Sequence, residues 1–499
     1  MKKLALIVLD GWGIGKEDEH NGIFMAKPEF FNNLWQNYPH TTLQASGEYV
    51  GLPEGQIGGS EVGHLTLGAG KVIYQELPRI TKSLEEKESN EPISKNVNFL
   101  KLIELAKKNT LNLIGMISPG GVHSHENHLY KLLEILKRNG CLSPNIHFIA
   151  DGRDVSPLYG IESAKRLINK IKELNFGQVV TLSGRFYAMD RDKNMNRTQK
   201  AIDLYTSGKA PLEKTLVGAF QTSYDKKILD EFIEPVVVNS SFKGIGKDEP
   251  LFFFNFRTDR MKQLVSEINK AIPTNPIFTM TRYDKSFPYP VIFEKKGVEN
   301  TVGEIIGKYK LAQLRAAETE KYAHVTYFFN GGVERVFDGE QRILIESNKN
   351  ITHDQMPEMK AKEIAQAVTN EVPKINPNFI LVNFANADMV GHTGKMPAII
   401  TAIKATDEAL KKMCEYLVSQ GYVCCITADH GNADQTFDYK ANHASTAHSL
   451  NPVPFIIYDK DNQGIRLNQD KNNGLSKVAG TILKLMEIKE AEGFDNLMS

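Results

Sequence analysis

The chain of 499 residues has few cysteines and no apolar run long enough to cross a membrane. Its four cysteines are Cys141, Cys414, Cys424 and Cys425, and they form no Cys-x-x-C pair. We expect reduced thiols that pack in the interior, which is typical of a cytoplasmic protein. The short apolar stretch of residues 4–9 stops at acidic Asp10, so we expect a first strand here and no secretory signal.

Neither sign of charge is in excess, because Lys+Arg and Asp+Glu both number 60. A general nucleic-acid surface or a polybasic membrane patch requires such an excess, so we expect neither partner. Apolar content of 41% and charged content of 24% are ordinary for a soluble globular protein. We expect a monomer that acts on a small molecule, with any anion bound by a local cluster of basic residues.

Short apolar, β-rich segments alternate with helical segments along the whole chain, and this alternation predicts an α/β fold. The length favours two domains. The clearest strand candidates in the middle of the chain are 112–117, 147–151, 179–183 and 251–256, and the clearest helix candidates are 129–138 and 160–174.

The residues that suggest chemistry are concentrated at the two ends of the chain. One sheet built from both ends would bring them together, and the middle would then be an inserted domain. We therefore predict a discontinuous metal-binding domain from residues 1–76 and 311–499. The inserted α/β domain, 77–310, is expected to bind the substrate.

Three strand candidates each run directly into acidic or imidazole side chains. Asp10 follows the first strand, Asp388 and His392 follow 379–384, and Asp429 and His430 follow 422–427. The i,i+4 spacing of Asp388 and His392 would place both side chains on one face if a helix begins there. One Asp-Gly or Asp-His-Gly alone is more often a turn. Three parallel strands, however, would deliver these side chains to one edge of the sheet. Carboxylate oxygen and imidazole nitrogen suit Mn²⁺ or Zn²⁺.

A glycine-rich loop ends in Ser60-Glu-Val-Gly-His64, which is a candidate for a nucleophile at the start of a helix. We expect Ser60 at the N-cap, and simple capping is the alternative interpretation. A helix N-terminus behind glycines also binds anions. A hydroxyl beside a divalent cation can ionise and attack a phosphoryl group, and Asp10 would share that cation.

Long motifs along almost the whole chain resemble those of the cofactor-independent phosphoglycerate mutases, within the alkaline phosphatase superfamily. They are Asp10-Gly-Trp-Gly, Ser60-Glu-Val-Gly-His64, Gly120-Gly-Val-His123-Ser-His125, Asp151-Gly-Arg153-Asp154, Gly184-Arg185-Phe-Tyr-Ala-Met-Asp-Arg191, Asn255-Phe-Arg257-Thr-Asp-Arg260, Ala317-Glu-Thr-Glu-Lys321, Ala428-Asp-His-Gly-Asn and Thr446-Ala-His448.

The resemblance implies interconversion of 3- and 2-phosphoglycerate in glycolysis and gluconeogenesis, without 2,3-bisphosphoglycerate. It also implies a phosphoserine intermediate and two divalent metal ions, usually manganese. One ion would be held by Asp388, His392 and His448, and the other by Asp10, Ser60, Asp429 and His430.

The resemblance further implies that the inserted domain binds the glycerate. The residues implied are His123, Arg153, Asp154, Arg185 and Arg191, with Arg257 and Arg260 facing the phosphate and Lys321 stabilising its charge. Guanidinium groups suit a carboxylate because they bind it bidentately. Asp154 could transfer the proton between the two hydroxyls as general acid and base. The i,i+3 spacing of Arg257 and Arg260 favours one shared face at a helix start.

Two rival interpretations remain. A metal-dependent phosphatase, sulfatase or phosphopentomutase-like enzyme could share the core, although Asp151-Gly-Arg153-Asp154 argues against it. A metal-storing or regulatory binding protein is disfavoured because a nucleophile, a lysine and the arginines are all present. Two departures from the family pattern are Gly59, where asparagine often precedes the serine, and Thr258, where proline is usual; neither removes a proposed metal ligand.

Overall fold

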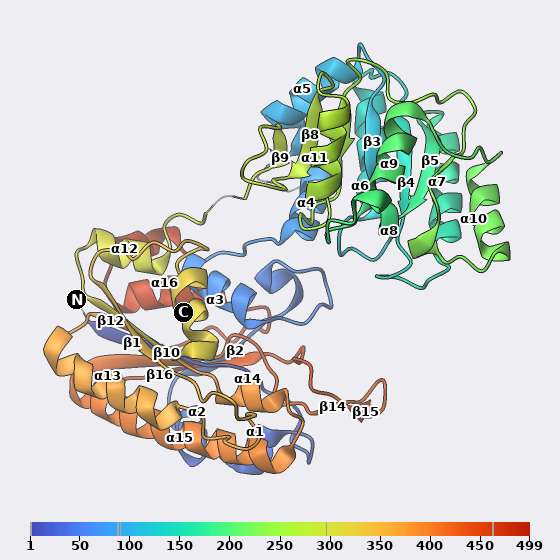
Figure 1. Cartoon of the computed structure of the whole chain (residues 1–499). Coiled ribbons are helices and arrows are strands. Elements are labelled where there is room, and N and C mark those ends of the chain that lie inside the picture. The colour runs from blue at the N-terminus through green and yellow to red at the C-terminus, as the bar shows by residue number, and fades with distance from the viewer. Residues whose placement is uncertain (1, 87–88, 90, 296, 462–463) are drawn as a thin grey trace. The chain divides into compact units, whose positions relative to one another are not determined.

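The computed structural model describes residues 2–499 except 87–88, 90, 296 and 462–463. The chain forms two compact units: unit 1 is Met1–Gln75 with Gly297–Ser499, and unit 2 is Glu76–Lys296 (Figure 1). The second boundary differs from the predicted one, since residues 297–310 belong to unit 1. The reason is helix α12 (Val302–Lys308), whose apolar side chains pack in the core of that unit.

In the described part of unit 1, seven strands form one sheet in the order β11-β10-β12-β1-β13-β16-β2. The first five run parallel, and β16 pairs antiparallel with both of its neighbours. Both ends of the chain therefore build one sheet. The strands are β1 (Lys3–Leu9), β2 (His40–Leu43), β10 (Gln313–Glu318), β11 (Glu340–Ile345), β12 (Phe379–Phe384), β13 (Tyr422–Thr427) and β16 (Val453–Tyr458).

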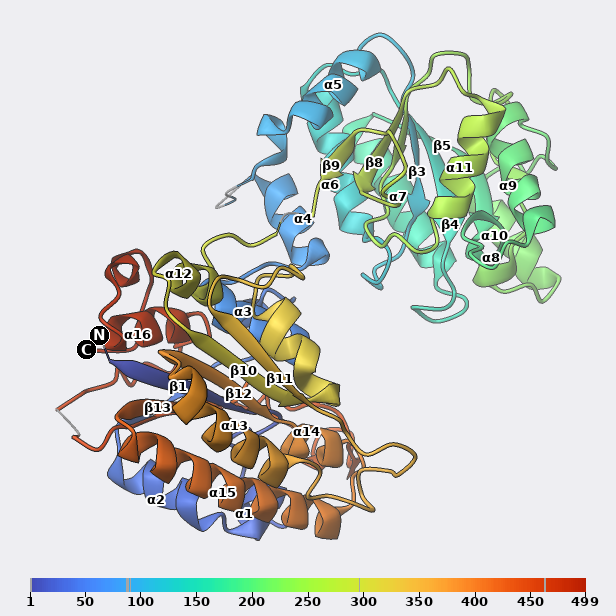
Figure 2. The same ribbon diagram turned by 60° about the vertical axis from the view of Figure 1, so that its left-hand side comes forward.

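Helices cover both faces of this sheet (Figures 1 and 2). The central strands β1, β12 and β13 are buried along almost their whole length, which explains their continuous apolar sequences. One face carries α1 (Gly22–Ala26), α2 (Glu29–Asn37), α13 (Ala361–Ile375) and α15 (Met396–Ser419), and the other carries α3 (Ser60–Ala69), α12 and α16 (Lys477–Leu485). A short helix α14 (Asn386–Gly391) follows β12, and β14 (Phe437–Asp438) pairs with β15 (His443–Ala444).

Unit 2 has its own sheet, whose described strands lie in the order β6-β5-β4-β3-β7-β8-β9. All of its neighbouring strands pair parallel except β5 and β6. Each of the four predicted strands is present in this sheet. The strands are β3 (Asn112–Met116), β4 (Asn145–Ala150), β5 (Gln178–Gly184), β6 (Val236–Val237), β7 (Leu251–Phe253), β8 (Ile277–Thr281) and β9 (Val291–Phe293).

Two hydrophobic cores lie on the two faces of the second sheet, since successive strand residues such as Leu113 and Ile114 belong to different cores. The predicted helix at 160–174 is observed with those bounds, and the one at 129–138 begins slightly earlier. The first core includes α4 (Glu76–Glu85), α5 (Val97–Ala106), α6 (Glu126–Arg138), α7 (Gly160–Leu174) and α10 (Leu216–Asp225); the second includes α8 (Arg185–Ala188), α9 (Met195–Ser207) and α11 (Lys262–Ala271).

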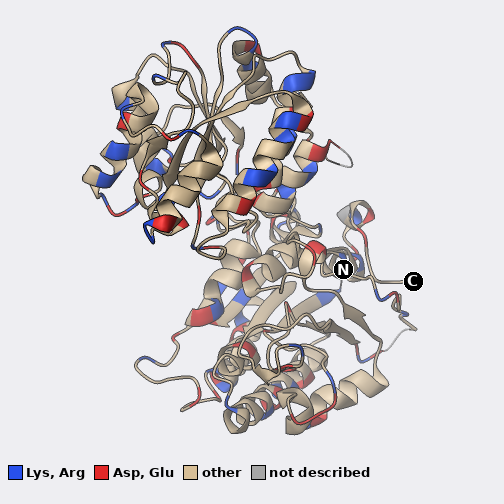
Figure 3. Ribbon diagram, turned by 90° about the vertical axis from the view of Figure 1, so that its right-hand side faces the viewer, with Lys and Arg blue, Asp and Glu red and all other residues tan. Residues whose placement is uncertain are grey.

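Charged residues of both signs are interspersed along the ribbons of both units (Figure 3). The four cysteines are buried free thiols, as expected. Among the described residues, we find no helix that is both long and apolar enough to span a membrane.

Candidate metal centre and nucleophile

Three buried carboxylates meet at the carboxyl edge of the sheet in unit 1. Strand β1 lies between β12 and β13 and is parallel to both. Asp10, Asp388 and Asp429 follow these strands and are at most 2% exposed. The predicted convergence of three strand ends is therefore confirmed.

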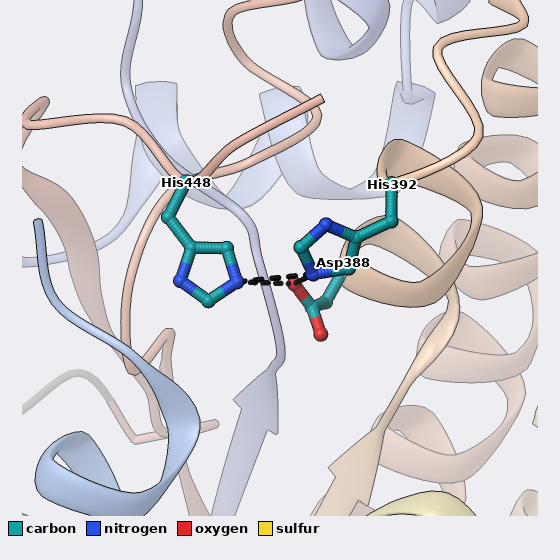
Figure 4. A group of neighbouring side chains, drawn as sticks. All are labelled: Asp388, His392 and His448. Atoms are coloured by element: carbon teal, nitrogen blue, oxygen red, sulfur yellow. Dashed lines mark hydrogen bonds and ion pairs between the residues drawn. The ribbon is translucent and has the colours of Figure 1, made fainter. Parts of the chain in front are cut away.

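Two histidines and one of these carboxylates face a common point (Figure 4). Oδ1 of Asp388 lies 3.2 Å from Nε2 of His392 and 3.1 Å from Nε2 of His448, and the two Nε2 atoms are 3.1 Å apart. Each Nδ1 lies 2.8 Å from a backbone carbonyl oxygen, of Thr446 and Gly58 respectively. Each Nδ1–H therefore donates to a carbonyl oxygen, which leaves both Nε2 atoms facing the Asp388 carboxylate. Histidine ligands of metal ions are commonly oriented in this way.

Helix α14 accounts for part of this geometry. It begins at Asn386, directly after β12, and His392 lies at its C-cap. The expectation that Asp388 and His392 share one helix face is confirmed. His448 comes from the loop before β16, which runs antiparallel and therefore starts at the same edge of the sheet.

Ser60 lies at the centre of the site, but one detail of the prediction is wrong. The N-cap of α3 is Gly59, in extended backbone, and Ser60 is the first helical residue. Its hydroxyl is consequently free of a capping role. It donates to Oδ1 of Asp10 at 3.0 Å and lies 2.9 Å from Nε2 of His430.

Lys321 links the nucleophile candidate to two carboxylates. Its Nζ donates to Ser60 Oγ at 2.7 Å, to Asp10 Oδ1 at 2.7 Å and to Asp388 Oδ2 at 2.6 Å. Burial by itself lowers the pKa of Lys321, but the two aspartates raise it above its usual range. Lys321 opposes the effect of burial on Asp388 and holds the pKa of that carboxyl well below its usual range.

His430 and Asp429, at the same edge of the sheet, also favour the binding of a cation. Burial lowers the pKa of His430, but Asp429, Asp10 and Asp388 raise it to about 10. Oδ2 of Asp429 is buried without a hydrogen-bond partner in the part of the chain that the structure describes. An orphaned carboxylate oxygen and an imidazole that holds a proton so strongly both indicate excess negative charge.

The donor set therefore fits divalent metal ions. Asp388, His392 and His448 bring three ligand atoms within 4.8 Å of one another, and so do Asp10, Asp388 and His430. Oxygen and imidazole nitrogen are the ligand types that manganese and zinc accept.

In unit 2, a second cluster lies at the carboxyl edge of its sheet. Arg185, which follows β5, donates through Nη1 to Asp154 Oδ2 at 2.7 Å and to Asp151 Oδ1 at 2.6 Å. Its Nη2 donates to His123 Nε2 at 3.0 Å. Burial and the charge of Arg185 lower the pKa of His123 to about 4, so this imidazole is neutral near pH 7. Its Nδ1 is buried without a partner among the described residues.

The other predicted arginines surround this cluster. Asp259 accepts from Arg191 Nη1 at 2.7 Å and from Arg257 Nε at 3.1 Å. Burial and the like charges of Arg185 and Arg191 lower the pKa of Arg260. Such a concentration of positive charge would be relieved by a bound anion.

One detail of the arginine prediction differs from the structure. Arg257 and Arg260 do not share a face at a helix start, because α11 begins only at Lys262. Both lie in the segment between β7 and that helix. Arg153 is exposed and lies 3.5 Å from Glu231.

Comparison with known proteins agrees with this geometry. The model of the metalloenzyme superfamily matches residues 2–490. A 2,3-bisphosphoglycerate-independent phosphoglycerate mutase of Symbiobacterium thermophilum is 41% identical, covering 99% of this chain and 97% of its own length. The corresponding protein of Acetivibrio thermocellus is 42% identical, with 99% and 98% coverage. The chain belongs to this mutase family.

A solved structure agrees as well. The crystal structure of Leishmania mexicana phosphoglycerate mutase at low cobalt concentration has a TM-score of 0.59 and 27% identity, covering 100% of this chain and 98% of that one. The resemblance to the mutase family inferred from the sequence motifs is thereby confirmed, as is the two-part α/β fold.

Sequence reasoning gave no role to three residues of these clusters. Asp151 follows β4 and accepts from Ser118 Oγ, from Arg185 and from the backbone N–H groups of residues 153 and 154. Its position directly after a strand, like that of Asp10, was an available signal. Asn383 donates to Asp10 and also lies within hydrogen-bond distance of His64. The only sequence signal for Asn383 was a polar residue in an apolar strand.

Proposed function

We propose that this protein interconverts 3-phosphoglycerate and 2-phosphoglycerate without 2,3-bisphosphoglycerate, as a glycolytic and gluconeogenic enzyme of the cytoplasm. The observation that carries the proposal is the Ser60 hydroxyl, which lies between a buried ammonium, a carboxylate and an imidazole. Family membership and the separate arginine cluster support a phosphorylated, carboxylate-bearing substrate.

We assign two divalent metal ions, most simply Mn²⁺, to unit 1. Bound there, they would neutralise phosphate charge and favour the ionised form of the serine hydroxyl. The proposed ligands are Asp388, His392 and His448 for one ion and Asp10, Ser60, Asp429 and His430 for the other. The related Leishmania mexicana structure was determined at low cobalt concentration, which supports the assignment of divalent metal ions here.

Ser60 is proposed to be the nucleophile. Its Oγ attacks phosphorus, so the Oγ–P bond forms while the bond from phosphorus to the C3 oxygen of the glycerate breaks. Asp10 Oδ1 already accepts the hydroxyl proton, and Lys321 Nζ stabilises negative charge on Oγ. Uncatalysed hydrolysis of a phosphate monoester is so slow that enzymes accelerate it by up to ~10²¹-fold, and charge neutralisation supplies much of this stabilisation.

Unit 2 is proposed to retain the glycerate and rearrange it. Arg153, Arg185 and Arg191 would bind its carboxylate, and the unpartnered Nδ1–H of His123 would donate to one of its oxygens. Arg257 and Arg260 would neutralise the phosphate. Retention of the glycerate is what separates a mutase from a phosphatase, because water must not replace it.

Asp154 completes the proton balance. Its carboxyl group gives a proton to the departing C3 oxygen, and the resulting carboxylate then takes the proton from the C2 hydroxyl. That hydroxyl attacks the phosphoserine, the Oγ–P bond breaks, and Ser60 recovers from Asp10 Oδ1 the proton that it gave up in the first transfer. No external base or phosphate donor is consumed. Arg185 holds Asp154 Oδ2 in place for both transfers.

The test is incubation of the purified protein with 3-phosphoglycerate and Mn²⁺ in the absence of 2,3-bisphosphoglycerate. We expect 2-phosphoglycerate and almost no free phosphate. Free phosphate as the main product would support the phosphatase alternative. Mn²⁺ binding without either product would support the non-catalytic binding protein.

A further inference from the structure

Two buried residues outside the proposed ligand set connect the nucleophile's helix to Asp10. Asn383 lies in β12, and His64 lies in α3, one helical turn after Ser60; both are fully buried. Nδ2 of Asn383 donates to Asp10 Oδ2 at 2.8 Å and lies 3.1 Å from His64 Nε2. Nδ1 of His64 lies 2.9 Å from the backbone carbonyl oxygen of Ser60.

The direction of each hydrogen bond in this chain follows from the charge of Asp10. A carboxylate accepts only, so the amide of Asn383 must present its N–H₂ group to it. The second N–H of that group then faces His64 Nε2, which must accept and carries no proton. The ring proton is therefore on Nδ1, where it can be donated to the Ser60 carbonyl.

His64 also forms a group with Asp10 and Asp429 whose spacing could hold a metal ion. Its Nδ1 is 3.2 Å from Asp429 Oδ2. Both ring nitrogens, however, already have partners, so a ligand role would break the chain of hydrogen bonds. The geometry favours His64 as a support of the ligands and not as a ligand.

Burial of the Asn383 side-chain carbonyl destabilises the fold, and the hydrogen bonds of its two N–H groups must offset this effect. Its Oδ1 is buried with no hydrogen-bond partner in the described structure. An unpaired buried carbonyl destabilises the fold, and a leucine of similar shape would avoid that cost. Such an exception at the base of a candidate active site points to a functional role.

We propose that Asn383 and His64 are positioning residues that together fix the position of Asp10 relative to Ser60. Asn383 engages Asp10 Oδ2 and thereby turns Oδ1 toward Ser60 Oγ and Lys321. His64 fixes the first turn of α3 through its hydrogen bond to the backbone carbonyl oxygen of Ser60. This inference rests on the proposed function, in which Asp10 and Ser60 bind one divalent ion.

The test is Mn²⁺ binding to the full-length, metal-free protein, measured by isothermal titration calorimetry on N383L, on H64N and on the double variant. Loss of an outer partner typically weakens metal binding 10–100-fold, so we expect N383L to bind one of the ions at least about tenfold more weakly. In H64N the asparagine amide can still donate toward the Ser60 carbonyl but no longer accepts from Asn383. Because both changes break one chain, the double variant should bind within about threefold of the weaker single variant.

Asn330→Leu is the matched control. Asn330 is equally buried in unit 1, has an unpartnered Oδ1, and donates to a carboxylate, Glu340 Oε2, at 3.0 Å. This variant should bind Mn²⁺ within about twofold of the wild type, because the Asn330 amide donates to Glu340 and to the Arg335 carbonyl oxygen, and neither residue belongs to the proposed ligand set. Thermal unfolding in chelator establishes that each variant is folded. If N383L does not fold, H64N alone still tests the proposed chain of hydrogen bonds.

The inference is overturned if folded N383L or H64N binds both ions as tightly as the wild type. It is also overturned if the two effects multiply, as expected for a histidine that ligates the metal independently. Absence of Mn²⁺ binding by the wild-type protein would instead remove the proposed metal function itself.

Discussion

Lys321 acts in unit 1 as a fixed positive charge among carboxylates, and its replacement by methionine should make the stability of this unit depend on metal. Methionine keeps much of the apolar length of the side chain and removes the ammonium group. Lys321 is 3% exposed and donates to Asp10, Asp388 and Ser60 at 2.6–2.7 Å. Without it, two buried carboxylates lose their closest cation.

The size of the effect follows from this burial. Removing one partner of a buried ion pair costs about 3–5 kcal/mol. For a unit of this size, each kcal/mol lowers the unfolding temperature by about 2–4 °C, so K321M should unfold roughly 6–20 °C below wild type in chelator. Bound Mn²⁺ would neutralise the same carboxylates. The difference should therefore shrink markedly at saturating Mn²⁺, and K321M should bind Mn²⁺ more tightly than the wild type does.

Differential scanning calorimetry with chelator and with Mn²⁺ measures both quantities. Lys395→Met is the control, because Lys395 pairs with Asp354 on the surface and such pairs contribute only about 0–1 kcal/mol. The mutase rate of K321M should fall by at least about 10²–10³-fold. An equal loss of stability with and without Mn²⁺, or no loss at all, would refute the idea that ammonium and metal neutralise the same charges.

Three further predictions concern the nucleophile, the metal and the arginine cluster. Ser60→Ala should abolish 2-phosphoglycerate formation while leaving the unfolding temperature and Mn²⁺ binding by the other ligands largely intact; substantial turnover would exclude the phosphoserine route. Mn²⁺ affinity should fall as pH decreases from about 8 to 6, because carboxylates raise the pKa of His430 to about 10 and the metal must displace its proton. Calorimetry in buffers of different ionisation enthalpy should detect proton release, and a pH-independent affinity would contradict this. Asp151→Asn should lower kcat/KM by up to about 100-fold, because Asp151 orients Arg185 and the loop that carries Asp154; unchanged steady-state kinetics would exclude that role.

Much of the fold could be predicted because its signals are local in sequence. The apolar runs before Asp10, Asp388 and Asp429 predicted three buried parallel strands, and rules for parallel sheets placed their ends at one edge. The spacing of Asp388 and His392 predicted a shared helix face. These inferences need no knowledge of what each side chain contacts.

The remaining features depend on contacts between residues far apart in the chain. Asn383 and His64 are separated by 319 positions, so no local pattern indicates their hydrogen bond. The N-cap could have been Gly59 or Ser60, because either residue can adopt the extended backbone conformation that Gly59 has at this position. The boundary before α12 was misplaced because its apolar residues could have packed in either unit.

The central claim is that Ser60 carries the phosphoryl group between the two positions of the glycerate. The most direct test is to mix the Mn²⁺-loaded protein with 3-phosphoglycerate labelled in its phosphate, stop the reaction with acid within one turnover, and map the labelled peptides. The account predicts label on the peptide that contains Ser60, and none in Ser60→Ala. Formation of 2-phosphoglycerate in the same interval with no label on that peptide would contradict it.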